Sequence, residues 1–346
     1  MQRGLSLAII MATLFLTSPL GVRADARLQA EQEVPGHWKA EWPKTDFKRS
    51  LVDFSEIFSG GPPKDGIPAI DNPVFESVDA AGTAAPGPTE PVMSLAIAGD
   101  ARTYPLRILI WHEIVNDTVG GTPVSVTFCP LCNSGVVFHR QVAGEETTFG
   151  TTGRLRNSDL VMYDRATESW WQQFVGRAIV GLRAGTELER IPARLESYAD
   201  FTARHPAGKV LVPNGRHLRD YGRNPYAGYD RSPKPFLYTG DYTGPGRPLM
   251  RVVSVPGANQ AWSMELVKQQ GEIRAIGTPV GDLLLSWKDG QNSALDTSTI
   301  SEGRDVGTVV VQRRTVAGAL QDVVYDVPFA FAFNAFHPDA PIHHVD

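Results

Sequence analysis

Residues 92–140 have the sequence VMSLAIAGDARTYPLRILIWHEIVNDTVGGTPVSVTFCPLCNSGVVFHR, and this stretch decides the fold class. Residues 92–106 predict two strands joined by a tight turn at AGD, because apolar runs flank a Gly-Asp pair. Residues 106–119 place leucine and isoleucine at helical spacing, which predicts one short helix. The run TPVSVTF at residues 122–128 predicts a strand that leads directly into two cysteines.

The remainder of the chain continues with short elements and frequent turns. Hairpins are predicted over residues 134–150 and 160–176, and alternation in the second places one of Trp170 and Trp171 inward and the other outward. A brief helix is predicted over residues 197–206, a loop rich in Tyr, Gly and Pro over 219–248, and strands over 281–287, 306–314 and 323–333. The pattern predicts a β-rich α+β fold with mixed and antiparallel sheets and few short helices.

Three segments are expected along the chain. Residues 1–24 resemble a signal peptide, with a basic start, an apolar core too short to span a membrane and a small-x-small cleavage site. Residues 25–90 are rich in Pro and Gly and predict an irregular N-terminal arm, and residues 91–346 form the core domain. The expected anchors of the arm are Trp38, Phe54 and Phe75. A periplasmic or secreted protein without a membrane span is therefore expected.

The charge balance argues against nucleic acid as a partner. The predicted leader contains Arg3 and Arg23 and no acid, so the 33 basic residues fall to 31 against 38 acidic ones, a formal charge of −7. Broad nucleic-acid binding requires a basic face. An unknown redox partner or a small molecule is the expected partner.

Cys129 and Cys132 are the only cysteines of the chain, in the motif FCPLCNSG. As a structural staple, a disulfide closing so small a ring contributes only about 2 kcal/mol, so the spacing favours chemistry over an inert crosslink. A redox pair needs an activated thiolate. The residues after Cys132 predict a strand rather than the helix of a thioredoxin fold, so the redox interpretation requires another fold. We therefore expect Cys129 to attack and Cys132 to resolve.

Metal binding is the close alternative. No second Cys pair is present, so two thiolates would need a distant histidine to complete a copper or zinc site. His112 precedes the cysteine strand and is the leading neighbour, either as a third metal ligand or as a cation that lowers a thiolate pKa. His139 is the second candidate. No cofactor is certain, and copper or zinc is the metal expected under this alternative.

Two further segments carry polar groups that could bind a ligand. GTTGRLRNSD at residues 150–159 combines a Gly-rich turn with Arg154 and Arg156, which could hold an anion or satisfy its own backbone. The tyrosines of the 219–248 loop could line a cleft or pack as a cover over the sheet. A non-catalytic ligand-binding protein with an inert disulfide is therefore a third possibility.

The motifs WHEIVND (111–117), TFCPLCNS (127–134) and NSDLVMYDR (157–165) resemble a family of exported bacterial and archaeal proteins of unknown function. The resemblance is specific over residues 102–212 and looser towards the C-terminus. It implies export and a working centre but no activity. The signature positions that it marks are His112, Glu113, Asn116, Asp117, Cys129, Cys132, Asn157, Ser158, Asp159, Tyr163, Asp164 and Arg165.

The sequence thus predicts an exported protein whose centre is the CxxC pair with His112. Redox thiol chemistry is the leading hypothesis, and a copper or zinc site of two cysteines and one histidine is the alternative. The expected ligand-binding residues around this centre are Arg154, Arg156, Asn157, Ser158, Asp159, Tyr163, Asp164 and Arg165.

Overall fold

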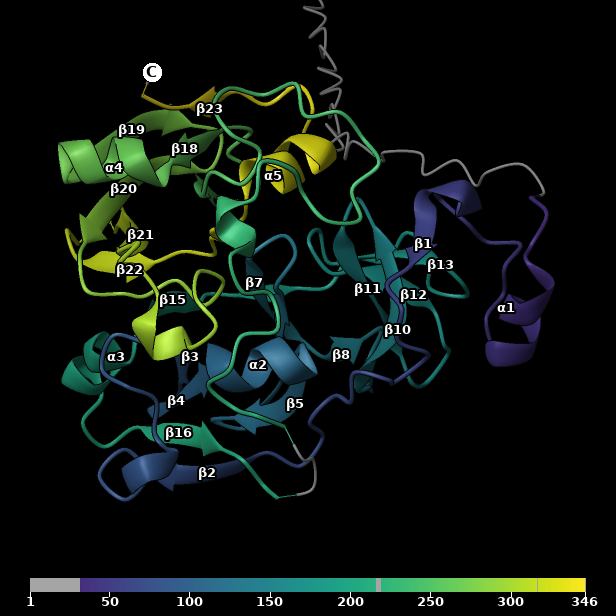
Figure 1. Ribbon diagram of the computed structural model, residues 1–346, viewed down its shortest axis with the longest axis horizontal. Coiled ribbons are helices and arrows are strands. Elements are labelled where there is room, and N and C mark those ends of the chain that lie inside the picture. The colour runs from purple at the N-terminus through teal and green to yellow at the C-terminus, as the bar shows by residue number, and fades with distance from the viewer. Residues whose placement is uncertain (1–31, 216–218, 316, 346) are drawn as a thin grey trace, which may run out of the picture.

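The computed structural model describes residues 32–215, 219–315 and 317–345. Within these ranges 23 strands form five sheets of three to five strands and one two-stranded sheet, and the helices are short. The five larger sheets are arranged as the blades of a propeller (Figure 1). The predicted β-rich α+β class is confirmed, whereas the predicted signal peptide lies outside the described residues. None of the described helices is long and apolar enough to cross a membrane.

We number the blades I to V in chain order. Blade I has the strand order β15-β3-β4-β16-β2, in which only the β4–β16 pair is parallel. The predicted hairpin between β3 and β4 is present, and its turn residues Ala98 and Gly99 have φ values of 48° and 84°. The predicted helix α3 (Tyr198–Arg204) begins after Ser197, whose side chain accepts from Asp200 N. The strands are β2 (Val74–Ser77), β3 (Pro91–Ile97), β4 (Asp100–Pro105), β15 (Arg194–Ser197) and β16 (Lys209–Val212).

Blade II carries the cysteines and has the antiparallel order β14-β7-β6-β5. The predicted hairpin over residues 134–150 is only partly correct, because β7 pairs with β6 and β14. The predicted turn instead closes the separate two-stranded sheet β8–β9. The strands are β5 (Ile114–Val119), β6 (Thr122–Cys129), β7 (Ser134–His139), β8 (Gln141–Val142), β9 (Glu145–Glu146) and β14 (Arg190–Ile191).

The helix predicted over residues 106–119 is wrong in its second half. Helix α2 (Leu106–His112) ends at Glu113, which has a φ of 57°, and the following residues form β5. The segment IVNDTV is rich in β-branched residues, which favour a strand, and it pairs along its whole length with β6. Sheet pairing therefore outweighs the helical spacing of Ile114 and Val115.

Blade III has the antiparallel order β1-β10-β11-β12-β13. The predicted hairpin over residues 160–176 forms between β11 and β12. Trp170 and Trp171 pack into two different hydrophobic clusters, as the predicted alternation implies, but neither is exposed, because the side expected to face outward is covered as well. The arm covers Trp170 with Trp38 and Trp42, whose rings lie 4.9 and 5.3 Å from it. The strands are β1 (Ile57–Ser59), β10 (Phe149–Arg156), β11 (Asp159–Asp164), β12 (Trp170–Gln172) and β13 (Arg177–Val180).

Blades IV and V come from the C-terminal third. Blade IV has the order β17-β18-β23, blade V the order β19-β20-β21-β22, and α4 (Met264–Gln270) connects them. The predicted strands over residues 281–287 and 306–314 correspond to β20 and β21. The strands are β17 (Val252–Ser254), β18 (Ala261–Ser263), β23 (Ile342–His343), β19 (Glu272–Thr278), β20 (Gly281–Lys288), β21 (Thr308–Arg314) and β22 (Leu320–Asp322).

The strand predicted over residues 323–333 is wrong along its whole length, because residues 323–329 form only isolated bridges at Asp326 and Phe329. The segment AFAFNAF forms helix α5 (Ala330–Phe336), of which Phe331 and Phe333 are at most 2% exposed. The alternation of Phe and Ala suggested a strand, but a segment buried on all sides carries no informative periodicity.

The described part of the predicted arm contains three regular elements. Strand β1 pairs with β10 of blade III, and β2 pairs with β16 of blade I. Trp38, in α1 (Gly36–Glu41), and Phe54 are buried, and Phe75 contacts Tyr104 edge-on at 5.5 Å. The arm therefore supplies the edge strands of two blades. Short 3-10 turns complete the structure at Phe54–Glu56, Gly82–Ala84, Tyr229–Arg231 and Ile300–Glu302.

Candidate functional site

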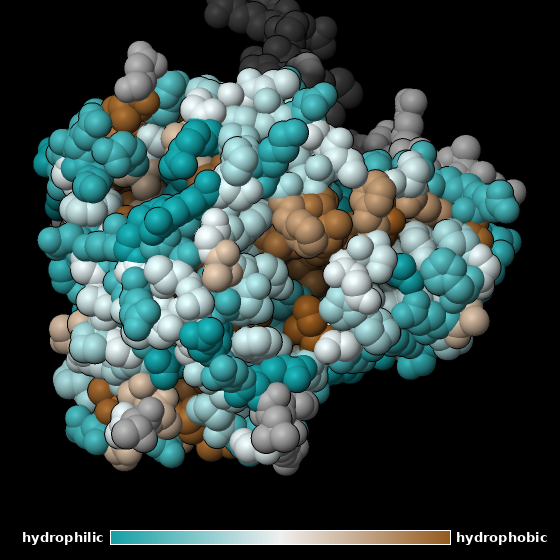
Figure 2. Space-filling view, viewed as in Figure 1, coloured by the Kyte–Doolittle hydropathy of each residue, from teal (hydrophilic) through white to brown (hydrophobic). Residues whose placement is uncertain are grey.

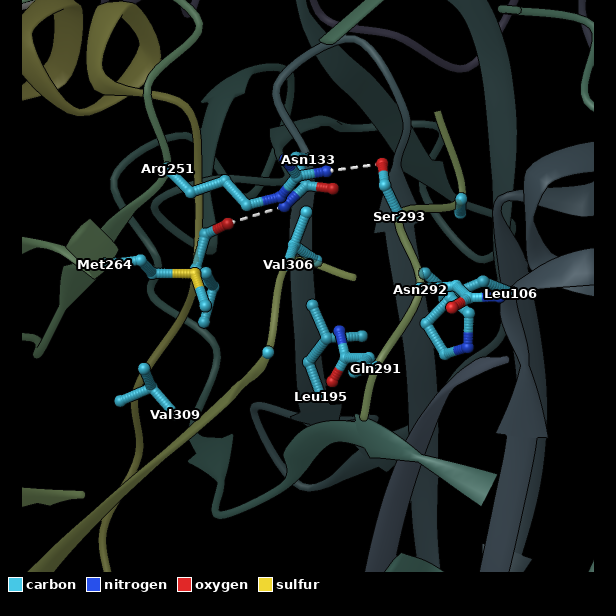
Figure 3. A pocket seen from close by; sticks show the side chains of 14 residues that line it. Leu106, Asn133, Leu195, Arg251, Met264, Gln291, Asn292, Ser293, Val306 and Val309 are labelled. Atoms are coloured by element: carbon cyan, nitrogen blue, oxygen red, sulfur yellow. Dashed lines mark hydrogen bonds between the residues drawn. The ribbon is translucent and has the colours of Figure 1, made fainter. Parts of the chain in front are cut away.

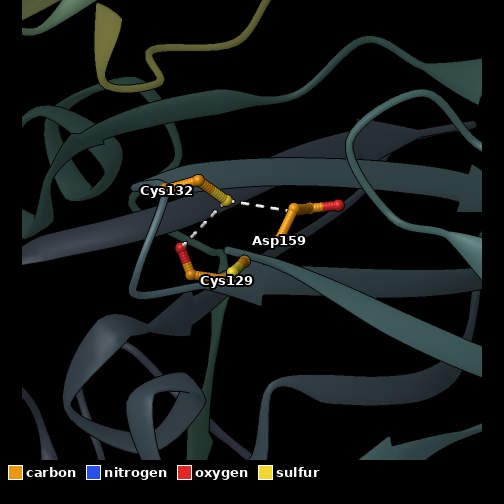
Figure 4. Close-up of side chains that lie close together, drawn as sticks. All are labelled: Cys129, Cys132 and Asp159. Atoms are coloured by element: carbon orange, nitrogen blue, oxygen red, sulfur yellow. Dashed lines mark hydrogen bonds between the residues drawn. The ribbon is translucent and has the colours of Figure 1, made fainter. Parts of the chain in front are cut away.

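A tight turn between β6 and β7 positions the two cysteines. Cys129 ends β6 and is paired in register with Ser134, the first residue of β7. Asn133 closes the turn with a φ of 52°, and its N–H donates to Pro130 O at 3.3 Å. A strand follows the motif, as predicted, so no thioredoxin-like helix begins there. The turn brings both thiols together at the end of the hairpin (Figure 4).

The third member of this group is Asp159, the first residue of β11. Cys132 Sγ donates to Asp159 Oδ1 at 3.0 Å (Figure 4). The other carboxylate oxygen accepts from Gln172 Nε2 at 2.6 Å and from Phe174 N at 2.9 Å. One donor atom from each of Cys129, Cys132 and Asp159 lies within 4.8 Å of the other two. Both cysteines are free thiols. We call these three residues the thiol–carboxylate cluster.

The thiol–carboxylate cluster is fully enclosed by protein. Each of its residues is at most 1% exposed. Burial raises the pKa of both thiols, that of Cys132 furthest, and raises the pKa of Asp159 to about 6 against the hydrogen bonds that it accepts. Near neutral pH the metal-free cluster therefore keeps both thiols protonated, whereas Asp159 is largely ionised.

Glu113 adds a fourth acidic group beside this cluster. Burial and the charge of Asp159 raise its pKa to about 8, and its own charge contributes to the raised pKa of Cys129. Among the described residues, neither Glu113 nor Asp159 takes part in an ion pair. Two thiols and two carboxyl groups thus share a dry region without a cationic side chain in salt-bridge contact with either acid.

Segments from the C-terminal part of the chain hold the cysteine turn in place. Asp326 accepts from Ser134 Oγ at 2.5 Å and from Gly135 N at 2.9 Å. Asn133 Nδ2 donates to Val327 O at 2.7 Å, and Phe329 N donates to Cys132 O at 2.8 Å. Asn133 also lines a void of about 10 Å³ (Figure 3), which has room for one water and not for a ligand.

The loop over residues 219–248 covers the same turn. Tyr229 Oη donates to Leu131 O at 2.8 Å, and Ser158 Oγ donates to Phe236 O. Ser158 O in turn accepts from Cys129 Sγ at 3.8 Å. Of the two predicted roles for this loop, these contacts correspond to the packed cover. Figure 2 shows a hollow beside blade III with apolar residues around it, and Phe236 is 57% exposed.

The predicted histidines lie outside the thiol–carboxylate cluster. His112 is buried, with Nδ1 2.7 Å from Pro68 O and Nε2 2.8 Å from Tyr221 Oη. His139 Nδ1 accepts from Gln141 N at 3.2 Å. Among the described residues, the candidate metal ligands that meet are two thiols and a carboxylate, so the third candidate ligand is Asp159 and not the predicted His112.

The two predicted anion-binding arginines bind acids of the chain itself. Arg154 pairs with Glu41 at 2.6 Å and lies over the Trp38 ring at 4.5 Å. Arg156 pairs with Glu56 at 2.7 Å. They project together from β10 towards the N-terminal arm, which they fasten to blade III. Asn157 forms the following turn, with a φ of 54°.

The remaining predicted site residues form structural contacts or a second polar group. Asp164 is fully buried and accepts from Trp171 Nε1 at 2.9 Å and from Thr167 N at 2.7 Å, which fixes the β11–β12 turn. Tyr163 donates to Asp65 at 2.6 Å, and Arg165 pairs with Asp71 at 2.6 Å. Asp65, Asp71 and Arg165 line a cavity of about 290 Å³ apart from the cysteines.

Sequence reasoning missed two groups that matter to the geometry. Asp326 had no signal beyond an isolated acid in the apolar run VVYDVPF. Glu113 belonged to the WHEIVND signature but was not assigned to the site, because the predicted helix continued through it. Its positive φ is the feature that turns the chain from α2 into β5.

A comparison with known families confirms the resemblance to a family of unknown function. The sequence model of a family described as "Protein of unknown function (DUF3179)" matches residues 64–340. The chain belongs to this family. Searches of curated proteins and of solved structures found no match. The DUF3179 match spans the thiol–carboxylate cluster, Glu113 and Asp326, and it starts within the predicted N-terminal arm.

Proposed function

We propose that the protein is an exported metal-binding protein that holds a zinc ion at Cys129, Cys132 and Asp159. The observation that carries this proposal is the meeting of three donor atoms within 4.8 Å in a region that protein fully encloses. Thiolates and carboxylates are ordinary zinc ligands, and the CxxC spacing on a turn suits structural zinc sites. Three ligands leave one position of a tetrahedral site for a further group.

Electrostatics supports a cation at this position. A buried thiolate or carboxylate without a counter-charge is costly, and the raised pKa values of the cluster express that cost. A divalent ion would offset this cost, since its charge stabilises the deprotonated forms of its ligands. Glu113 lies next to the cluster and is the candidate for the fourth position. The carboxylate ligand favours zinc over copper(I), which prefers thiolates alone.

Metal analysis of purified protein tests the proposal. We expect about one equivalent of zinc in the wild type, and background zinc in Cys129→Ser and Cys132→Ser, because each substitution removes a thiolate ligand. Asp159→Asn keeps the shape of the side chain and should weaken zinc binding by about 10–100-fold in competition with a chelator. Asp164→Asn is the matched control, since Asp164 is an equally buried acid of β11 outside the cluster. Wild-type protein that takes up no zinc would contradict the proposal. Uptake of copper alone would show that the site binds copper instead of zinc.

Dithiol–disulfide exchange is the second candidate, favoured by the 3.0 Å contact between Cys132 Sγ and Asp159. Cys129 would attack the disulfide of an oxidised partner. Cys132 would pass its proton to Asp159 and then attack the Cys129 sulfur of the mixed disulfide, which displaces the partner's second thiolate. The partner gains two electrons, and a Cys129–Cys132 disulfide remains. Reactive cysteines are usually partly exposed with a low pKa, so burial and the raised thiol pKa rank this candidate below metal binding. Reversible loss of two free thiols in metal-free wild type would favour it.

Export is part of the proposed function and rests on the pattern of residues 1–24. We expect cleavage after Ala24, which removes Arg3 and Arg23 and places the protein in the periplasm or outside the cell. The intact mass of protein recovered from the periplasmic or culture fraction measures this. A mass that begins at Met1, or recovery in the membrane fraction alone, would contradict export.

A further inference from the structure

A cavity lies between blades II, III and IV, and Phe174 separates it from the thiol–carboxylate cluster. It has a volume of about 530 Å³, within the range of small-molecule sites. Its apolar wall comes from Val136, Phe174, Val175, Leu188 and Val324. The Phe174 ring is held in place by stacking on Phe336 at 4.8 Å. The cavity therefore offers a preformed apolar surface of about the size of one aromatic or short aliphatic group.

Two arginines give this cavity its polar character. Among the described residues, the only hydrogen-bond acceptor of Arg190 is Phe174 O, at 2.9 Å from Nη2, so most of its donors remain available. Arg177 has only a distant ion pair, 3.9 Å to Glu187, whose side chain is 72% exposed at the rim. A guanidinium carries five donors in a planar fork that suits a carboxylate.

Two acidic residues, Glu187 and Asp326, line the cavity beside these arginines. The oxygens of Asp326 accept from Ser134, Gly135 and Val327 of the chain itself. Burial raises the pKa of Asp326 to about 6, and burial and the charge of Arg190 lower the pKa of His337. Near neutral pH the imidazole adds no charge, and Asp326 is a carboxylate that attracts Arg190 but already accepts hydrogen bonds within the chain. Arg177 and Arg190 therefore supply the donors that remain for a ligand carboxylate.

We propose that this cavity binds a small amphipathic monocarboxylate, with its carboxylate on Arg190 and Arg177 and its apolar part against Phe174 and the valine side chains. This site is distinct from the proposed zinc centre and does not depend on it. The two are neighbours through Phe174, whose N–H donates to Asp159 at 2.9 Å and whose C=O accepts from Arg190.

Calorimetric titration of the full mature chain with phenylacetate and with its neutral analogue phenylacetamide tests the proposal. We expect phenylacetate to bind at least about tenfold more tightly, because a charge-assisted bidentate contact contributes that much. In Arg190→Gln the preference for phenylacetate should fall by about three- to tenfold, since the variant keeps the apolar wall and Arg177 and loses one of the two guanidinium groups. Arg165→Gln, which alters the arginine of the cavity beside Asp71, should preserve the preference for the acid.

Arg177→Gln is the second variant, for use if Arg190→Gln does not fold as judged by circular dichroism. It should reduce the preference for phenylacetate by about three- to tenfold, because one of two guanidinium groups remains. Equal affinity of the acid and the amide for the wild type would overturn the proposal. An unchanged preference in the arginine variants that fold would overturn it as well.

Discussion

Glu113→Gln should stabilise the metal-free protein by about 2–5 kcal/mol at pH 8 and leave its stability unchanged at pH 4. Burial and the charge of Asp159 raise the pKa of Glu113 from 4.5 to about 8, so the folded protein keeps a proton that the unfolded chain releases. The stability that depends on this proton is complete below pH 4.5 and is lost as the pH rises to about 8. Glutamine has the shape of the protonated glutamate side chain and no charge, so the variant does not lose stability as the pH rises. Urea unfolding at both pH values, with zinc removed by a chelator, measures the difference.

Zinc-loaded protein serves as the internal comparison for this substitution. A bound cation lowers the pKa of neighbouring carboxyl groups, so Glu113→Gln should no longer stabilise the loaded protein, and it should weaken zinc binding if Glu113 is the fourth ligand. Glu302→Gln is the control, because Glu302 is exposed and its neutralisation should change stability by less than about 0.5 kcal/mol. Equal stability of wild type and Glu113→Gln at pH 8 would show that Glu113 is not a buried, protonated acid.

Asp230→Ala should destabilise the protein by about 3–5 kcal/mol and expose the cysteines. Asp230 is fully buried and accepts from Arg251 at 3.1 and 3.2 Å and from Ser293 Oγ at 2.6 Å. Its removal leaves the buried guanidinium of Arg251 without its acidic partner. Because Asp230 directly follows Tyr229, which donates to Leu131 O, the same change loosens the cover over the cysteine turn.

Two measurements separate these effects. Urea unfolding gives the loss of stability, and the rate of thiol labelling by Ellman's reagent under native conditions reports the cover. Asp220→Ala is the matched control, since Asp220 lies in the same loop with a side chain 77% exposed and should alter neither quantity. Labelling of Asp230→Ala at the wild-type rate would mean that the loop does not protect the thiols.

Local sequence patterns were sufficient for much of the fold. The turn at Ala98 and Gly99, the β11–β12 hairpin and helix α3 depend on contacts between near neighbours, and they occur where predicted. Two predictions were wrong: the strand predicted where helix α5 forms, and the second half of the helix predicted over residues 106–119. Long-range packing decides the first segment, and strand pairing decides the second. The propeller had no sequence signal, since its blades differ in strand number and no repeat period runs through the chain.

The candidate site was predictable in part for the same reason. The CxxC motif identifies the cysteine turn, because both residues lie on one short segment. Asp159 was among the predicted ligand-binding residues, but its contact with Cys132 joins strands of two blades, and no spacing rule connects residues so far apart. His112 lies close in sequence and hydrogen-bonds Pro68 and Tyr221 instead.

The bonds that hold the cysteine turn also determine how late in synthesis this turn can be completed. Asn133 and Ser134 bind partners 194 and 192 positions further along the chain. A ribosome adding about 5–20 residues per second needs roughly 10–40 s to synthesise that interval. Until then the nascent chain lacks the residues that accept from Asn133 and Ser134, although residues 219–248, which cover the turn, have already been made. The cysteine turn can therefore be fastened only after Asp326 and Val327 have been added, close to the end of synthesis.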